Sequence, residues 1–168
     1  MEDVRAVIDS AKARDQGQLE SLVRKRFPEL DDAQVHEGVE SATAIIDSVP
    51  AILALADAEA ERRGIARTVR PVLGRAIRYF VAPVDVVPEM TLGMAGLIDD
   101  AYLALRLIEH INSGPQPLIG WEFDEPLQLL RGLLTLEVVE VLDRESLATL
   151  DAASDEVSKV WSELAREA

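Results

Sequence analysis

The sequence predicts an all-α fold: a single-domain bundle of about six to seven helices around a central helical hairpin. Two observations support this prediction. Apolar residues recur at helical spacing along most of the chain, and the only β-branched cluster, Val81 to Val87, is interrupted by a proline. The chain has 168 residues, of which 48% are hydrophobic, so it is long and apolar enough to bury a core of its own.

The N-terminal residues predict short helices followed by a longer amphipathic one. Apolar residues repeat at helical spacing from Val4 to Phe27, and Gly17 marks a break or a weak point between two short helices. Pro28 ends this region. Asp31 or Asp32 then provides an N-cap for the next helix, because a short carboxylate accepts hydrogen bonds from the first free backbone amides.

The next region predicts a restart and then a basic helix. Ser48 followed by Pro50 has the pattern of a new helix start, in which a serine caps the helix and a proline occupies the first turn. We expect this helix to end at Gly64. A further helix is predicted from about residue 66 to residue 79, with Pro71 near its start.

The apolar stretch 79–98 predicts a tight corner between two helices. It contains two prolines and several acids, which argues against a membrane-spanning helix and favours a loop or a helical corner. Asp99 or Asp100 is expected to cap the helix that follows, and the Asn-Ser-Gly-Pro sequence 112–115 ends it.

The C-terminal third predicts a loop and two more helices. Residues 116–125 form the loop, in which Trp121 and Phe123 are expected to attach the segment to the core. Helical patterns then run from 126 to about 142 and from 146 to 166.

These elements define the predicted domain organisation. Residues 1–168 form one domain, in which 66–111 is the helical hairpin core, and 1–65 and 116–168 supply flanking helices. Within the core, the helices at about 66–80 and 99–112 are expected to pack on each other as a buried pair.

The corner carries the pattern Y-x-x-x-P-x-D-x-x-P-[DE], followed by G-x-x-D-D. The residues at these positions are Tyr79, Pro83, Asp85, Pro88, Glu89, Gly96, Asp99 and Asp100. This pattern resembles the core of the bacterial YkvA-like domain, a family of unknown function (DUF1232), over about residues 66–111. The resemblance implies an apolar helix, a proline-containing turn and a second apolar helix, and it implies no particular activity because the family has none established.

Charge is distributed unevenly along the chain. The 31 acidic and 17 basic residues give a net charge of −14, yet residues 61–80 carry six arginines and a single acid. Two interpretations stay open. The arginines pair with the acidic segments on either side, or Arg67, Arg70, Arg75 and Arg78 bind an external anion.

Composition excludes several classes of function. The chain has no cysteine, which excludes a thiol nucleophile, a disulfide framework and a cysteine-ligated metal. The acidic balance argues against nucleic-acid binding, which depends largely on cations that neutralise phosphates. Charges appear from Glu2 onward with no export signal before them, so a cytoplasmic protein of bacterial type is expected.

Four carboxylates at the corner form the candidate metal site. If the turn and the start of the next helix pack together, Asp85, Glu89, Asp99 and Asp100 could converge on Mg²⁺ or Ca²⁺, which prefer oxygen ligands. The alternative is that these side chains cap helices and satisfy backbone amides. The spacing lacks the alternation and the glycine of a calcium-binding loop.

Histidine and serine chemistry has little support in the sequence. His36 precedes Glu40 where a zinc-binding helix would have a second histidine, and His110 is expected in the last turn of its helix. No serine lies in a glycine-flanked nucleophile turn. The sequence therefore identifies no catalytic residue, and it favours a protein that is not an enzyme.

The predicted function is a non-catalytic interaction or scaffold protein. Its acidic surface or its apolar hairpin would bind a protein partner, and a basic partner would associate quickly and with a marked dependence on salt. One alternative is a metal-binding protein or metal-dependent enzyme built on the four carboxylates. A second alternative is peripheral association with a membrane surface through the arginines of 62–78 and the apolar corner.

Overall fold

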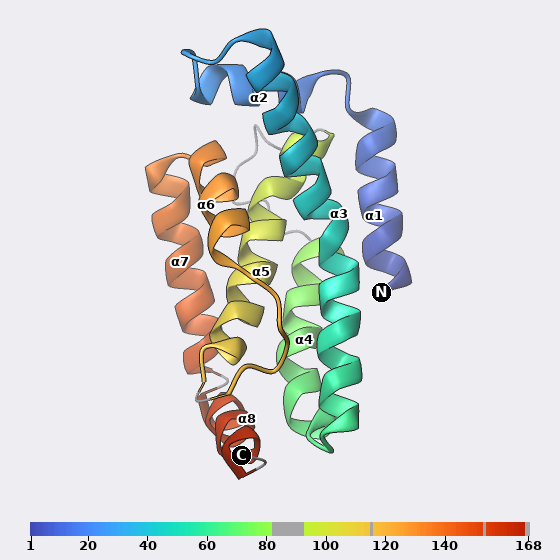
Figure 1. Ribbon diagram of the computed structural model, residues 1–168, viewed down its shortest axis with the longest axis vertical. Coiled ribbons are helices and arrows are strands. Elements are labelled where there is room, and N and C mark those ends of the chain that lie inside the picture. Colours follow the sequence, from blue (N-terminus) through green and yellow to red (C-terminus); the bar gives the residue numbers. More distant parts are fainter. Residues whose placement is uncertain (82–92, 115, 153, 167–168) are drawn as a thin grey trace.

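The computed structural model describes residues 1–81, 93–114, 116–152 and 154–166, and within these residues it contains eight α-helices, one short 3₁₀ helix and no strand. The prediction of an all-α fold is confirmed, with slightly more helices than expected. The elements are α1 (Glu2–Arg14), α2 (Gln18–Arg26), α3 (Asp32–Arg62), α4 (Ala66–Val81), the 3₁₀ helix η2 (Met94–Leu97), α5 (Ile98–Asn112), α6 (Asp124–Leu133), α7 (Leu136–Asp151) and α8 (Ser154–Arg166) (Figure 1).

Helix α5 lies at the centre of the bundle. It contacts α3, α4, α6, α7 and α8, and its contact with α4 is the most extensive between any two elements of the described chain. Figure 1 shows α3 and α4 on one side of α5 and α6 and α7 on the other. Eleven of its 15 residues are buried, so α5 is enclosed around most of its circumference. The predicted hairpin is therefore present as the α4–α5 pair.

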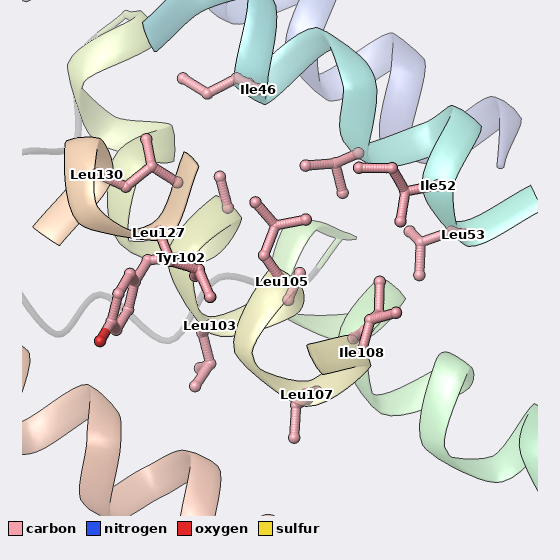
Figure 2. Packing of buried hydrophobic residues seen from close by; sticks show 14 of the residues in the cluster. Ile46, Ile52, Leu53, Tyr102, Leu103, Leu105, Leu107, Ile108, Leu127 and Leu130 are labelled. Atoms are coloured by element: carbon pink, nitrogen blue, oxygen red, sulfur yellow. The ribbon is translucent and has the colours of Figure 1, made fainter. Parts of the chain in front are cut away.

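Apolar side chains from every α-helix meet in one continuous cluster. Figure 2 shows Ile46 and Leu53 of α3 facing Leu105 and Ile108 of α5, with Leu130 of α6 closing the cluster from another side. All five are almost completely buried. Burial of each such side chain stabilises the fold by roughly 1.5–3 kcal/mol, so the packing around α5 is the main source of stability.

Helix α3 is continuous, and the predicted restart at Ser48 and Pro50 is wrong. The Ser48 hydroxyl donates to the Ile45 carbonyl 2.7 Å away inside the helix instead of capping a new one. Pro50 lacks the N–H that would bond to the Ile46 carbonyl, a cost of about 3 kcal/mol in a helix interior. The neighbouring apolar side chains offset this cost because they are buried on both sides of the proline: Ile46, Val49, Ile52 and Leu53.

The predicted N-cap of α3 is confirmed and leads to a first prediction. Asp31 Oδ1 accepts the Gln34 N–H at 2.9 Å, and Gln34 Oε1 accepts the Asp31 N–H at 3.0 Å, a reciprocal capping box. We expect Asp31→Ala to lower the free energy of unfolding by about 1 kcal/mol in urea titrations. Asp31→Asn retains the hydrogen-bond acceptor, so its free energy of unfolding should be close to that of the parent protein. Equal losses in the two variants would contradict this role of the side chain.

The boundaries of the C-terminal helices differ from the predicted ones. The helix predicted to run from 126 to 142 ends at Leu133, and a new helix begins at Leu136. Thr135 marks this start, because its Oγ1 accepts the Val138 N–H at 3.1 Å. The break predicted at 143–145 lies inside α7. The predicted break was wrong because the polar Asp-Arg-Glu sequence lies on the more exposed side of a continuous helix and does not end it.

Three aromatic residues attach the C-terminal half to the centre. Trp161 of α8 donates its Nε1–H to the Ile111 carbonyl of α5 at 2.9 Å. In the loop before α6, Trp121 and Phe123 pack edge to face with ring centroids 4.6 Å apart, and Phe123 is buried. The prediction that this aromatic pair holds the loop against the core is confirmed.

Candidate functional site

The structure places half of the motif positions at one end of the α4–α5 pair. Tyr79 lies in the last turn of α4, Gly96 lies in η2, and Asp99 and Asp100 lie in the first turn of α5. The other four positions, Pro83, Asp85, Pro88 and Glu89, fall outside the described residues.

The two aspartates do not cap α5, which corrects the sequence prediction. The 3₁₀ helix η2 runs directly into α5, which begins at Ile98, so Asp99 and Asp100 are already helical. Asp99 Oδ1 accepts the Asp100 N–H at 3.1 Å. Both residues are buried, with exposed fractions of 8% and 7%. Carboxylates in the first turn remain favourable because the free backbone amides give this end of a helix a partial positive charge.

A cavity adjoins the two aspartates between α4, α5 and α7. Its volume is about 160 Å³, and its walls include Tyr79, Asp99 and Asp100 together with Glu145 of α7. The remaining lining residues are apolar: Leu103, Val141 and Leu142. Sequence reasoning missed Glu145 because no local pattern links it to a motif more than 40 residues earlier. The cavity thus combines three carboxylates with an apolar wall.

The described residues do not test the four-carboxylate metal site as a whole. Among them, no group of three His, Cys, Asp or Glu side chains has an arrangement that could hold a metal ion. The predicted site requires Asp85 and Glu89, which are not described. Coordination of Mg²⁺ or Ca²⁺ by the predicted set therefore stays a prediction.

Arginines around the α3–α4 turn are paired with acids of α3. Arg62 lies 2.7 Å from Glu59, and Arg70 lies 2.8 Å from both Asp57 and Glu61. The hydrogen bond from Arg62 lowers the pKa of Glu59, and the bond to Asp57 raises the pKa of Arg70. These contacts match the interpretation that the arginines pair with a neighbouring acidic segment.

The predicted anion site includes one of these paired arginines. Arg67 and Arg78 are exposed on α4 and Arg75 is half-buried, while Arg70 shares its guanidinium with two carboxylates. An external anion would compete with those carboxylates for Arg70. Anion binding by the four arginines stays a prediction.

A polar group connects α5 to α7. The Tyr102 hydroxyl donates to Asp143 Oδ1 at 2.8 Å, and Arg106 Nε lies 3.5 Å from the same oxygen. Arg106 also pairs with Glu109. The ring of Tyr102 is buried, and Figure 2 shows its oxygen pointing away from the apolar side chains that surround the ring. This group fixes the position of α7 on the central helix.

The buried Tyr102 predicts a loss of stability at alkaline pH. Burial, followed by the hydrogen bond to Asp143, raises its pKa to about 12 from the ordinary value of about 10. The folded state keeps a proton that the unfolded chain loses in this range, so the free energy of unfolding should fall as pH rises from about 10 to about 12. Urea titrations of the parent protein and Tyr102→Phe test this, since the variant should show a shallower decline. Identical declines would contradict it.

Among the described residues, neither histidine side chain forms a hydrogen bond with a serine side chain. His36 is exposed on α3 and lies 3.3 Å from Glu40. His110 lies in the last turn of α5, as predicted, and burial lowers its pKa. Its Nε2 has no hydrogen-bond partner in the described part of the chain.

The outer face of α7 combines exposed leucines with acids. Leu136 and Leu147 are 71% and 52% exposed and lie three helical turns apart on one face. Glu140 and Arg144 lie between them on the same face and are exposed. We call these four residues the α7 strip. Within the described helices α7 packs against α5 and α8, and Figure 1 shows it at the outer edge of the bundle.

Length and composition alone would allow one helix to cross a membrane. This is α3, whose most apolar window has a mean hydropathy of 1.5, and 39% of that window is buried inside the bundle. The core helix of a globular domain passes the same test, and α3 supplies part of the core shown in Figure 2.

Comparison with known protein families identifies one match. Residues 70–105 match the family described as "Protein of unknown function (DUF1232)". We call residues 70–105, which are similar to this family, the DUF1232 segment. The segment begins in α4 and ends in the middle of α5, so it includes the most extensive helix contact of the bundle and the two buried aspartates. The resemblance inferred from the motif is therefore confirmed over 36 of the 168 residues.

The remaining helices surround the DUF1232 segment. Helices α1 and α2 contact η2, α3 and α8 contact α4, and α6 and α7 contact α5. Comparison with curated proteins and with solved structures finds no match. The family description assigns no activity, so function has to be argued from the residues of this chain.

Proposed function

We propose that this protein is a non-catalytic interaction protein that binds a basic protein partner through its acidic surface. The observation that supports this proposal is the separation of charge in the folded chain. Arg62 and Arg70 form ion pairs with acids of α3, so those cations are largely compensated within the protein. Helix α7 carries five acids and one base, a net charge of −4, and exposes most of these acids.

Such a surface favours association with a partner of opposite charge. Complementary potentials accelerate the encounter of two proteins and reject partners of the same charge. The attraction between exposed charges is screened as salt is added, because the Debye length falls from about 10 Å at 0.1 M to about 3 Å at 1 M ionic strength. A basic partner should therefore bind more weakly as the salt concentration rises.

The experiment is affinity capture followed by a quantitative binding measurement. The intact protein is immobilised, proteins retained at low salt are identified, and the Kd of each purified candidate is measured by calorimetry. We expect a basic protein whose Kd rises at least roughly tenfold as ionic strength increases from about 0.1 M to about 1 M. A salt-independent Kd for every candidate would contradict the proposal. Cosedimentation with anionic vesicles in place of any protein would favour the membrane alternative.

A divalent-metal site is the second candidate, because Asp99, Asp100 and Glu145 line one cavity, although these three are not arranged to hold a metal ion by themselves. Asp85 and Glu89 would have to complete the ligand set. A ligand that binds only the folded state raises its stability, so Mg²⁺, Mn²⁺ or Ca²⁺ should raise Tm relative to chelator, and Asp99→Asn should abolish the increase. An unchanged Tm with all three metals would exclude this candidate.

A further inference from the structure

We infer that the α7 strip is the contact surface for the partner and that the partner presents a basic amphipathic helix to it. This inference rests on the proposed function, because it specifies where the acidic surface acts and what it recognises. The site consists of Leu136 and Leu147 with Glu140 and Arg144 between them, and Glu137 is exposed beside it.

The apolar part of the strip has the geometry of a helix-packing face. The two leucines are eleven positions apart in the sequence, which places them about 16 Å apart along the axis and about 20° apart around it. A neighbouring helix that lies alongside α7 would contact both, since aligned side chains of two helices interlock along their length. Among the exposed large hydrophobic residues of the described chain, these two have the highest exposed fractions. Their burial by a partner would remove apolar surface from water.

The charged part of the strip determines which helix fits. Helix α7 has a net charge of −4, and Glu140 and Glu137 are exposed on the same side of the line that joins the leucines, about 40° and 100° around the helix from Leu136. A partner helix with leucines at matching positions and lysines or arginines beside them would contact both the leucines and the glutamates. A second copy of this chain would bring two such acidic helices together, and like charges at an interface disfavour association. The occupant is therefore a basic helix.

Arg144 provides an independent check on the charge argument. It is the only basic residue of α7 and lies within the strip, so it opposes a basic partner. Replacing it with glutamine removes one repulsive charge without changing the leucines. Arg144→Gln should therefore bind a basic helix more tightly than the parent protein, by a few-fold at low salt.

The test uses two synthetic helical peptides of equal positive charge. One has leucines 11 residues apart on one face, and the other has serines at those two positions. Binding to the full-length protein is measured by fluorescence anisotropy at low salt. We expect the leucine peptide to bind at least roughly tenfold more tightly than the serine peptide, and we expect the variant L136S/L147S to lose this difference. Leu55 of α3 is 44% exposed, so Leu55→Ser is the matched control and should keep the difference.

The possible contrary outcomes distinguish a failure of this inference from a failure of the proposed function. Equal, salt-dependent affinities for the two peptides would overturn the inference about the strip and leave the acidic-surface proposal intact. No binding of either peptide at low salt would count against both. Sedimentation that shows a dimer of the parent protein and a monomer of L136S/L147S would overturn the inference in favour of a second copy. Discrimination that survives in L136S/L147S would place the contact elsewhere on the molecule.

Discussion

Gly93→Ala should lower the free energy of unfolding by on the order of 3 kcal/mol. Gly93 precedes η2 and has φ of 65° and ψ of −154°, a conformation that only glycine adopts readily. A Cβ at this position would lie 2.9 Å from Asp15 Cα and 2.8 Å from Asp15 Oδ1. Side-chain rotation could relieve the contact with Asp15 Oδ1, but the contact with Asp15 Cα is with the backbone that links α1 to α2 and cannot be relieved in this way. Urea titration measures the loss.

The same segment explains why the effect should extend beyond Gly93. Asp15 Oδ1 accepts the Gln18 N–H at 3.1 Å at the start of α2. Displacing Asp15 would therefore weaken α2 as well as its contact with η2. Gly74, in the interior of α4, is the matched control because a Cβ there meets no other atom. Gly74→Ala should stabilise the protein by about 0.5–1 kcal/mol. A Gly93→Ala variant as stable as the parent protein would contradict this account of the turn.

Asn112→Ala should lower the free energy of unfolding by on the order of 2–4 kcal/mol, because it removes the hydrogen-bond partners of both backbone groups of the buried Ile119. Asn112 is the last residue of α5. Its Oδ1 accepts the Ile119 N–H at 2.9 Å, and its Nδ2 donates to the Ile119 carbonyl at 3.1 Å. Ile119 is buried, so water does not replace these bonds easily. Thermal and urea unfolding measure the loss.

Asn112→Asp is the control that separates hydrogen bonding from packing. Aspartate has nearly the same shape and keeps the acceptor for the Ile119 N–H, but its second oxygen would face the Ile119 carbonyl. We expect it to be destabilised as well, with part of the loss recovered below the pKa of the carboxyl group, where a protonated oxygen can donate. Full stability of both variants would show that the loop is held by its aromatic residues alone.

Local signals predicted much of the helical fold. Asp31 identified the start of α3 because an N-cap is a property of a few adjacent residues, and the sequence from Asn112 correctly ended α5. Pro50 misled the prediction, since the burial that keeps α3 continuous depends on helices far away in the chain. The end of α6 was missed although two local signals mark it, Gly132 in its last turn and Thr135 at the start of the next helix.

The candidate site was predictable only in part. Tyr79, Asp99 and Asp100 were found from their spacing in a short motif, and they do line one cavity. Glu145 joins them through the packing of α7 against α5, which no local pattern encodes. The bond from Tyr102 to Asp143 was unpredictable for the same reason. The exposed leucines of α7 were recognisable as outward-facing only once the buried side of that helix was known.

The central claim is that the acidic surface of α7 binds a basic partner, and the dependence of Kd on ionic strength tests it most directly. The measurement uses the purified partner with the parent protein and with a Glu137→Gln, Glu140→Gln double variant. We expect log Kd to rise with log ionic strength for the parent protein, and we expect the double variant to bind more weakly and with a smaller slope. Equal slopes for the two proteins, or a Kd independent of salt, would contradict it.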